Sequence, residues 1–182
     1  MRALSVVLVC AMVIGVARDA APASAIAPLT AAQVRAFMSA PTRHVRGVDG
    51  PMSAILAEGL RRSGTFAHLV LALDNSDVIV YIESGRLMPA AIAGRLLLAA
   101  GPEGHRYLRI QVSGRPGSSD IIALVGHELR HALEVAESPE VRDEASLIAL
   151  YERIGHASTG AHHYDTVAAQ AAGRKVKAEL AG

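Results

Sequence analysis

The sequence predicts an α+β fold, in which helices pack on one face of a small and mostly antiparallel sheet. Three observations support this fold class. A helical pattern ends near residue 62, short apolar runs between residues 66 and 112 are separated by turn-forming residues, and further helical patterns follow residue 118. Helices and strands that are segregated along the chain are typical of α+β folds.

Residues 1–25 have the pattern of a secretory signal peptide. Arg2 supplies a positive charge, an apolar run extends over Ala3–Ala17, and Ala23–Ala25 offers a cleavage site. The apolar run is too short to favour a stable membrane span. The only cysteine, Cys10, lies in this segment, so the processed chain would have neither a disulfide nor a thiolate ligand. We therefore expect a secreted or periplasmic protein.

The charge balance argues against a nucleic-acid partner. Removal of residues 1–25 leaves equal numbers of basic and acidic residues, and a neutral chain has no electrostatic attraction for phosphates. Residues 26–50 are rich in Ala, Pro and Gly and are expected to form an N-terminal arm or linker with one short helix, Thr30–Ser39. Residues 51–182 are long enough for one domain with its own core.

The first part of that domain contains one helix and two predicted hairpins. Pro51 suits the first turn of a helix that ends at Arg62. Two β-hairpins are then expected, and each of them encloses a turn-forming sequence. They pair Phe66–Leu73 with Val78–Ile82 and Arg95–Ala100 with Tyr107–Val112.

The last of these strands alternates in character. Leu108, Ile110 and Val112 would face the core, while the residues between them are polar or amphipathic. We therefore expect a sheet with one buried face and one face in water.

Three helices are expected after the strands. The first begins near Ser118, Ser119 and Asp120, which offer N-caps, and stops before Pro139. In the second, Ser138-Pro139-Glu140 would be the N-cap, first position and first-turn acid. Its apolar face would comprise Leu147, Ile148, Tyr151 and Ile154, and the third helix would run through Val167, Ala171, Val176 and Leu180.

The first of these helices carries the chain's main chemical signal, His127-Glu128-Leu129-Arg130-His131. Residues four apart share one helix face with Cβ atoms roughly 5–6 Å apart. Both imidazoles can therefore reach one zinc ion at about 2.0–2.1 Å. Glu128 would lie beside the metal, where its carboxylate can take a proton from a bound water, so we expect it to be the general base.

The segment Leu124–Leu133 resembles the active-site helix of zincin metallopeptidases, and the resemblance is confined to this helix and its surroundings. It implies a zincin-like fold and a zinc-dependent hydrolase that cleaves peptides or proteins. It also implies that an edge strand pairs with extended substrate, which we expect of one hairpin strand. Arg130 departs from the usual pattern, which has uncharged residues there, and we expect its side chain to extend to the surface.

A third metal ligand must come from downstream. The elongated metzincin pattern is absent, since Glu134 stands where its glycine would be, so the resemblance favours a carboxylate. Our first choice is Asp165, which introduces the last helix and would be held rigidly there. The alternative role of Asp165 is the N-cap of that helix. Glu144 and Glu152 remain alternative ligands.

Several other polar residues lie downstream of the motif. Glu137 lies too close to the end of its helix, and Glu140 is better explained as a first-turn acid. His156, His162 and His163 are alternative ligands, and Tyr164 could donate to an oxyanion.

The sequence is compatible with three function classes. The leading one is an exported zinc-dependent hydrolase. The second is a non-catalytic binding or structural protein of the cell envelope with a metal-stabilised zincin-like core, and the third is a metal-free protein in which the motif is coincidental. A di-iron bundle is excluded because no second E-x-x-H follows residue 25, and a serine hydrolase is disfavoured because no G-x-S-x-G occurs.

Overall fold

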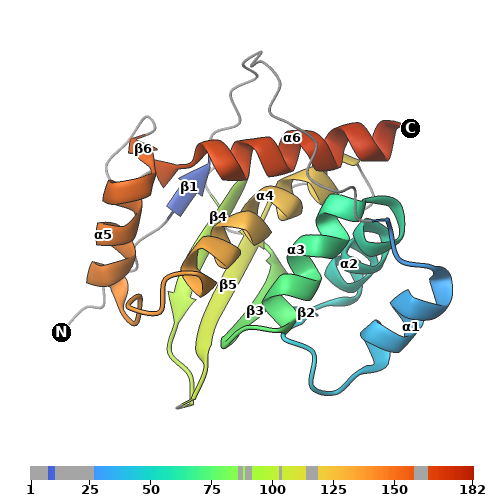
Figure 1. Cartoon of the computed structure of the whole chain (residues 1–182), viewed down its shortest axis with the longest axis horizontal. Helices are drawn as coiled ribbons and strands as arrows, with labels where there is room; N and C mark the ends of the chain where they lie inside the picture. Colours follow the sequence, from blue (N-terminus) through green and yellow to red (C-terminus); the bar gives the residue numbers. More distant parts are fainter. Residues whose placement is uncertain are drawn as a thin grey trace.

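The computed structural model describes residues 8–10, 27–85, 88, 92–102, 104–113, 119–157 and 164–182. Within these ranges, helices lie along one face of a five-stranded sheet (Figure 1). The α+β class is therefore confirmed. The strand order across the sheet is β1 (Leu8–Cys10), β4 (Gly94–Ala99), β5 (Arg106–Val112), β3 (Val78–Ser84) and β2 (Val45–Gly47).

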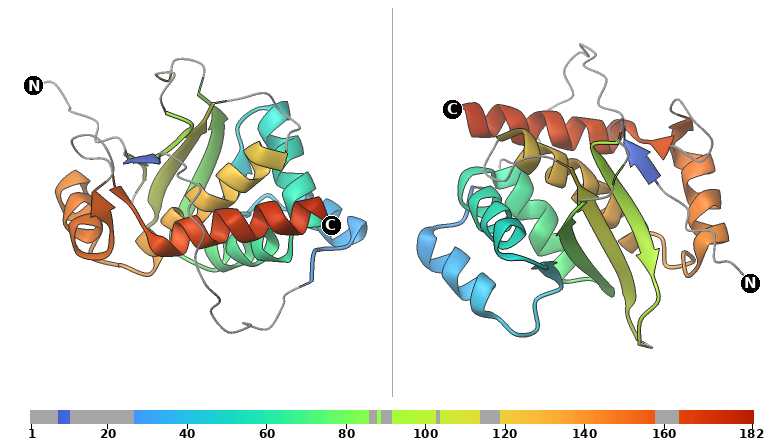
Figure 2. Two further views of the ribbon diagram at one scale, coloured as in Figure 1. Left: turned by 90° about the horizontal axis from the view of Figure 1, so that it is seen from above. Right: turned by 180° about the vertical axis from the view of Figure 1, so that it is seen from behind.

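The sheet is mixed rather than mostly antiparallel. Strand β5 pairs antiparallel with β4 but parallel with β3, and β3 pairs parallel with β2. The antiparallel pair of β4 and β5 confirms the second predicted hairpin. On the outer side of β4, β1 adds an antiparallel strand (Figure 2).

The first predicted hairpin is wrong, because residues 66–73 belong to helix α3 (Gly64–Asp74). Ser63 caps this helix by accepting a hydrogen bond from the backbone N–H of Phe66. A helix that is covered on most sides lacks the amphipathic period that identifies helices, so its apolar run looks like a buried strand. The buried residues of α3 are Gly64, Phe66, Ala67, Leu69, Val70 and Leu73.

Residues 27–49, which were expected to form an arm or linker, contribute helix α1 (Ala31–Ser39) and strand β2. A capping box between Thr30 and Gln33 begins α1, as the predicted helix requires. Val45 of β2 is fully buried, so this region takes part in the core. Apart from β1, the predicted signal peptide lies outside the described residues.

Helix α2 (Gly50–Arg62) begins at an Asp49 cap with Pro51 in its first turn, as predicted. It packs against α3 and β2. Within the described ranges, no helix combines the length and apolar character needed to cross a bilayer.

Helix α4 (Ser119–Ala136) carries the histidine motif and lies between the sheet and α6 (Val167–Ala181) (Figures 1 and 2). Two glycines bring α4 and α6 close together. A Cβ at Gly126 would lie 2.9 Å from Val176 Cγ2, and one at Gly173 would lie 3.2 Å from His127 Cβ. The motif is therefore covered by a second helix.

Helix α5 (Glu144–Ile154) begins later than predicted. Its N-cap is Asp143, and Glu140 lies in the turn that precedes the helix, so the first-turn role expected for Glu140 is wrong. Ile154, expected on the apolar face, is exposed. The buried residues of α5 are Leu147, Leu150 and Tyr151.

The two faces of the sheet differ as the alternation in β5 predicts. Leu108, Ile110 and Val112 are buried beneath the helices. On the opposite face Arg109 pairs with Glu83 of the neighbouring strand at 2.6 Å. The histidine motif on α4 lies on the other, helix-covered face of the sheet.

Candidate metal centre

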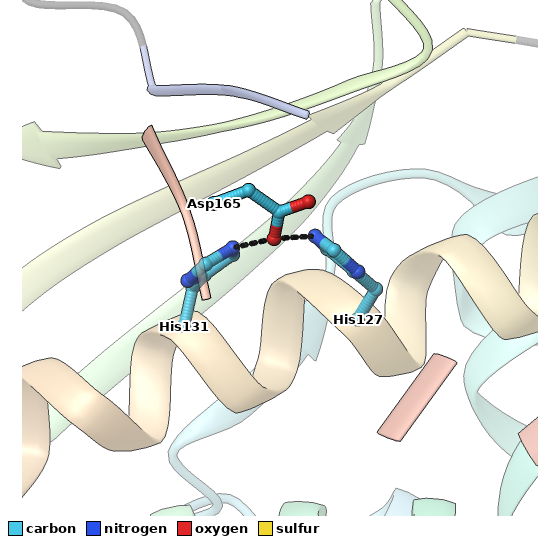
Figure 3. A group of neighbouring side chains, drawn as sticks. All are labelled: His127, His131 and Asp165. Atoms are coloured by element: carbon cyan, nitrogen blue, oxygen red, sulfur yellow. Dashed lines mark ion pairs between the residues drawn. The ribbon is translucent and has the colours of Figure 1, made fainter. Parts of the chain in front are cut away.

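The two histidines of the motif converge from one face of α4. Their ring centroids are 4.9 Å apart, and the exposed fractions of His127 and His131 are 5% and 0%. Figure 3 shows both rings turned toward the same point beside the helix. The expectation that these side chains share a helix face is confirmed.

Asp165 faces that point from outside α4. It ends the short strand β7 (Tyr164–Asp165), which pairs with β6 (His156–Ala157) just before α6. Its Oδ1 atom lies 3.4 Å from His127 Nε2 and 3.6 Å from His131 Nε2 (Figure 3). The side chain that caps α6 belongs to Thr166, so the alternative role of Asp165 as N-cap is wrong.

The separations among these atoms suit a shared cation. Two ligands of a tetrahedral zinc ion at about 2.0–2.2 Å lie about 3.3–3.5 Å from each other. The two separations from Asp165 are close to this value and exceed an ordinary hydrogen bond. One donor atom from each of the three residues lies within 4.8 Å of the others, so this buried group could hold a metal ion.

Glu128 lies on the side of α4 that faces strand β4, and it is fully buried. A Cβ at Gly94 would lie 2.5 Å from Glu128 Oε1, so the absence of a side chain at Gly94 makes room for the carboxylate. The negative charge of Glu128 also contributes to raising the pKa of His131. Glu128 therefore lies close to the centre without belonging to its three grouped ligands.

The two imidazoles differ in their proton affinity. Burial, together with the neighbouring His131, lowers the pKa of His127 to about 4. Burial also disfavours the charged form of His131, but Asp165 and Glu134 outweigh it and raise the pKa of His131 to about 9. A metal ion would compete with the proton on His131, because histidine binds metals in its neutral form.

Asp165 itself is held in its charged form. Burial raises the pKa of this carboxyl, but the neighbouring His131 and the hydrogen bond from Gln170 outweigh burial and lower the pKa to about 2. Gln170 Nε2 donates to Oδ2 at 2.9 Å, which leaves Oδ1 directed at the two histidines. The carboxylate is therefore available as an anionic ligand.

The alternative ligands that the structure describes lie away from this point. Glu152 is exposed and accepts a hydrogen bond from Tyr164, and His156 is exposed beside Gln170. Glu144 lies in the first turn of α5 and is not among the grouped ligands. His162 and His163 lie outside the described residues.

Sequence reasoning missed one buried residue of the centre, Glu134. It lies three residues after His131 on α4, is 4% exposed, and places Oε2 2.9 Å from His131 Nδ1. The available signal was its helical spacing from His131, since side chains three apart on a helix can meet.

The chain was also compared with known proteins. No protein-family model matches it, and neither the curated proteins nor the solved structures contain a match. The interpretation of this centre therefore rests on the residues of this chain.

Proposed function

We propose that this protein is an exported zinc-dependent hydrolase, and that its substrates are peptides or proteins. The observation that carries the proposal is the convergence of His127, His131 and Asp165 on one point, with Glu128 close by. Two imidazoles and one carboxylate are a ligand set typical of catalytic zinc, where three protein ligands leave a position for water or substrate. The resemblance of α4 to the zincin active-site helix supports the same reaction.

Each residue has a distinct part in this proposal. His127, His131 and Asp165 hold the ion, and the rigid packing of α4 against α6 keeps their donor atoms together. When bound, zinc supplies Lewis acidity and lowers the pKa of water to about 7. Glu128 accepts the proton of the attacking water and delivers it to the leaving amine.

The peptide specificity is supported by the edge of strand β4. Residues Leu8–Cys10 pair antiparallel with this edge, and Cys10 is opposite Gly94, the residue beside Glu128. The edge thus accepts an extended backbone next to the proposed base. An extended substrate would bind there through main-chain hydrogen bonds, as peptides do at other exposed sheet edges.

The test compares Glu128→Gln with the double variant His127→Ala/His131→Ala. We expect Glu128→Gln to retain zinc and to lose hydrolysis of a quenched fluorescent peptide library by a factor of about 10²–10⁴, the usual contribution of a general base. The double variant should lose both. Glu137→Gln is the matched control, because it makes the same change of a carboxylate to an amide at an exposed residue directly after α4.

The library assay is run with and without residues 1–25, because Leu8–Cys10 covers the β4 edge. Hydrolysis by Glu128→Gln at the rate of the natural protein would refute the role of Glu128. A protein that binds no zinc when zinc is in excess would refute the proposal as a whole.

A second candidate is a binding or structural protein whose metal stabilises the fold. The observation that favours it is the burial of the centre, since none of the three grouped ligands exceeds 5% exposure. Structural zinc sites are closed, whereas catalytic sites keep an open position. A protein that carries about one zinc, unfolds on chelation and cleaves no member of the library would support this second function.

A further inference from the structure

Glu134 contacts both segments that supply the grouped ligands. Its Oε2 atom lies 2.9 Å from His131 Nδ1, on the side of the ring opposite to the atom that faces Asp165. Its Oε1 atom accepts a hydrogen bond of 2.7 Å from Thr166 Oγ1. One carboxylate therefore joins helix α4 to the junction between β7 and α6.

Thr166 extends this connection to the third ligand. Its backbone N–H donates to Asp165 Oδ1 at 2.7 Å, and its hydroxyl accepts a hydrogen bond from the N–H of Ala169 as the cap of α6. The hydroxyl therefore acts as a hydrogen-bond donor to Glu134 and as an acceptor from the first turn of α6. Thr166 thus anchors Asp165 to the start of α6 and to Glu134.

Arg130 compensates the negative charge of the buried Glu134 carboxylate. Its Nε atom lies 3.7 Å from Glu134 Oε1, and its guanidinium also pairs with Glu137 at 3.1 Å. A buried carboxylate is costly unless an opposite charge or several donors compensate it. The Arg130 side chain thus lies beside the buried Glu134 with its Nε atom and pairs with the exposed Glu137 through its terminal nitrogen.

We propose that Glu134 is the positioning residue of the metal centre, and that it holds His131 directly and Asp165 through Thr166. This inference rests on the proposed function, because it assumes that the three ligands bind a metal ion. The Nδ1–H of His131 donates to Glu134, which fixes the ring so that Nε2 presents its lone pair to the ion. Arg130 stabilises the Glu134 carboxylate, which explains a charged residue within the motif.

The test measures zinc affinity by competition with a chelator, for Glu134→Ala, Glu134→Gln and Thr166→Val. Loss of an outer partner of a metal-bound histidine typically weakens binding by about 10- to 100-fold, and we expect this for Glu134→Ala. Glu134→Gln should weaken it less, because its amide oxygen can still accept from His131. Thr166→Val should weaken it several-fold, and Thr166→Ser, which keeps the hydroxyl, should restore it.

Glu137→Gln is the control directly after the same helix, because it also removes a carboxylate that pairs with Arg130. We expect its zinc affinity to be unchanged. The visible spectrum of the cobalt-substituted protein should shift for Glu134→Gln and not for Glu137→Gln, a difference that a general loss of packing would not produce.

Two results would overturn the inference. One is a zinc affinity and cobalt spectrum of Glu134→Gln and Thr166→Val equal to those of the natural protein. The other is an equal effect of Glu137→Gln. If Glu134→Ala does not fold, the Thr166 pair gives the same answer. Absence of zinc binding by the unsubstituted protein would instead refute the proposed function.

Discussion

Helix α4 takes part in two buried polar clusters that differ in how their charges are balanced. Near its C-terminal end, Arg106 of β5 is 4% exposed and donates to both carboxylate oxygens of Asp77, at 2.9 and 2.6 Å. Its remaining donors bind four carbonyl oxygens at the end of the helix and in the turn that follows it. These belong to Val135, Ala136, Ser138 and Val141.

The metal centre one to two turns earlier is built differently. There, His127, His131 and Asp165 direct donor atoms at one point, at separations that suit ligands of one ion. The guanidinium cluster contains its own opposite charge and matched hydrogen bonds, so it can stabilise the fold without a further component. Convergence of ligand atoms distinguishes a candidate binding site from a buried ion pair, and burial alone does not.

The largest expected effect is on the guanidinium cluster. Arg106→Met would remove the buried guanidinium and its charged hydrogen bonds to Asp77 and to the carbonyls at the end of α4, and we expect the free energy of unfolding to fall by about 3 kcal/mol in urea denaturation. Zinc affinity of the folded protein should not change. Arg109→Met, on the exposed face of the same strand, is the control and should cost less than about 1 kcal/mol. Equal losses would mean that the cluster adds no special stability.

The next prediction concerns the metal centre, because Asp165→Ala removes a proposed ligand. We expect zinc affinity to fall by more than about 100-fold, beyond the range for outer-shell partners. Glu152→Ala tests the alternative ligand and should leave the affinity unchanged, since Glu152 is exposed and pairs with Tyr164. Chelator competition on both variants decides between the two residues, and a greater loss for Glu152→Ala would reject Asp165 as the ligand.

Gly94→Ala separates catalysis from metal binding within the centre. The new Cβ would lie 2.5 Å from Glu128 Oε1 and 3.0 Å from Leu124 Cδ1, so the carboxylate must move. A misplacement of about 1 Å can cost about 100-fold in rate, and we expect a 10- to 100-fold loss of peptide hydrolysis with zinc retained. Gly50→Ala, where a Cβ would contact nothing within 4 Å, is the control. Full activity of Gly94→Ala would show that Glu128 does not need its present position.

The smallest expected effect is a pH dependence of the guanidinium cluster. A hydrogen bond from Arg106 lowers the pKa of Asp77 below its ordinary value of 3.8. The stability from this pair is therefore present above that value and is lost as the pH falls through the lowered pKa. The difference between the natural protein and Arg106→Met should narrow between pH 5 and pH 3 in urea titrations. A constant difference would assign the effect to the helix carbonyls alone.

The sequence by itself determined the features that depend on near neighbours in the chain. The helical spacing placed His127 and His131 on one face of α4, and the alternation in β5 separated the buried side of the sheet from the wet side. Pro51 located the start of α2. These features follow from local geometry, which repeats every 3.6 residues in a helix and every two in a strand.

Only the tertiary structure decided the features that join distant segments. The sequence of α3 predicts a strand, because a helix covered on most sides by other elements has apolar residues around most of its surface and lacks a helical period. The parallel pairing of β3 with β5 follows from how the chain crosses over, which strand patterns do not specify. The sequence favoured Asp165 but kept Glu144 and Glu152 as alternatives, and only the packing of α6 against α4 brings Asp165 alone of these three to the histidines. Glu134 contacts the same junction through Thr166. A contact between segments some thirty residues apart leaves no period in the sequence, so packing decides it.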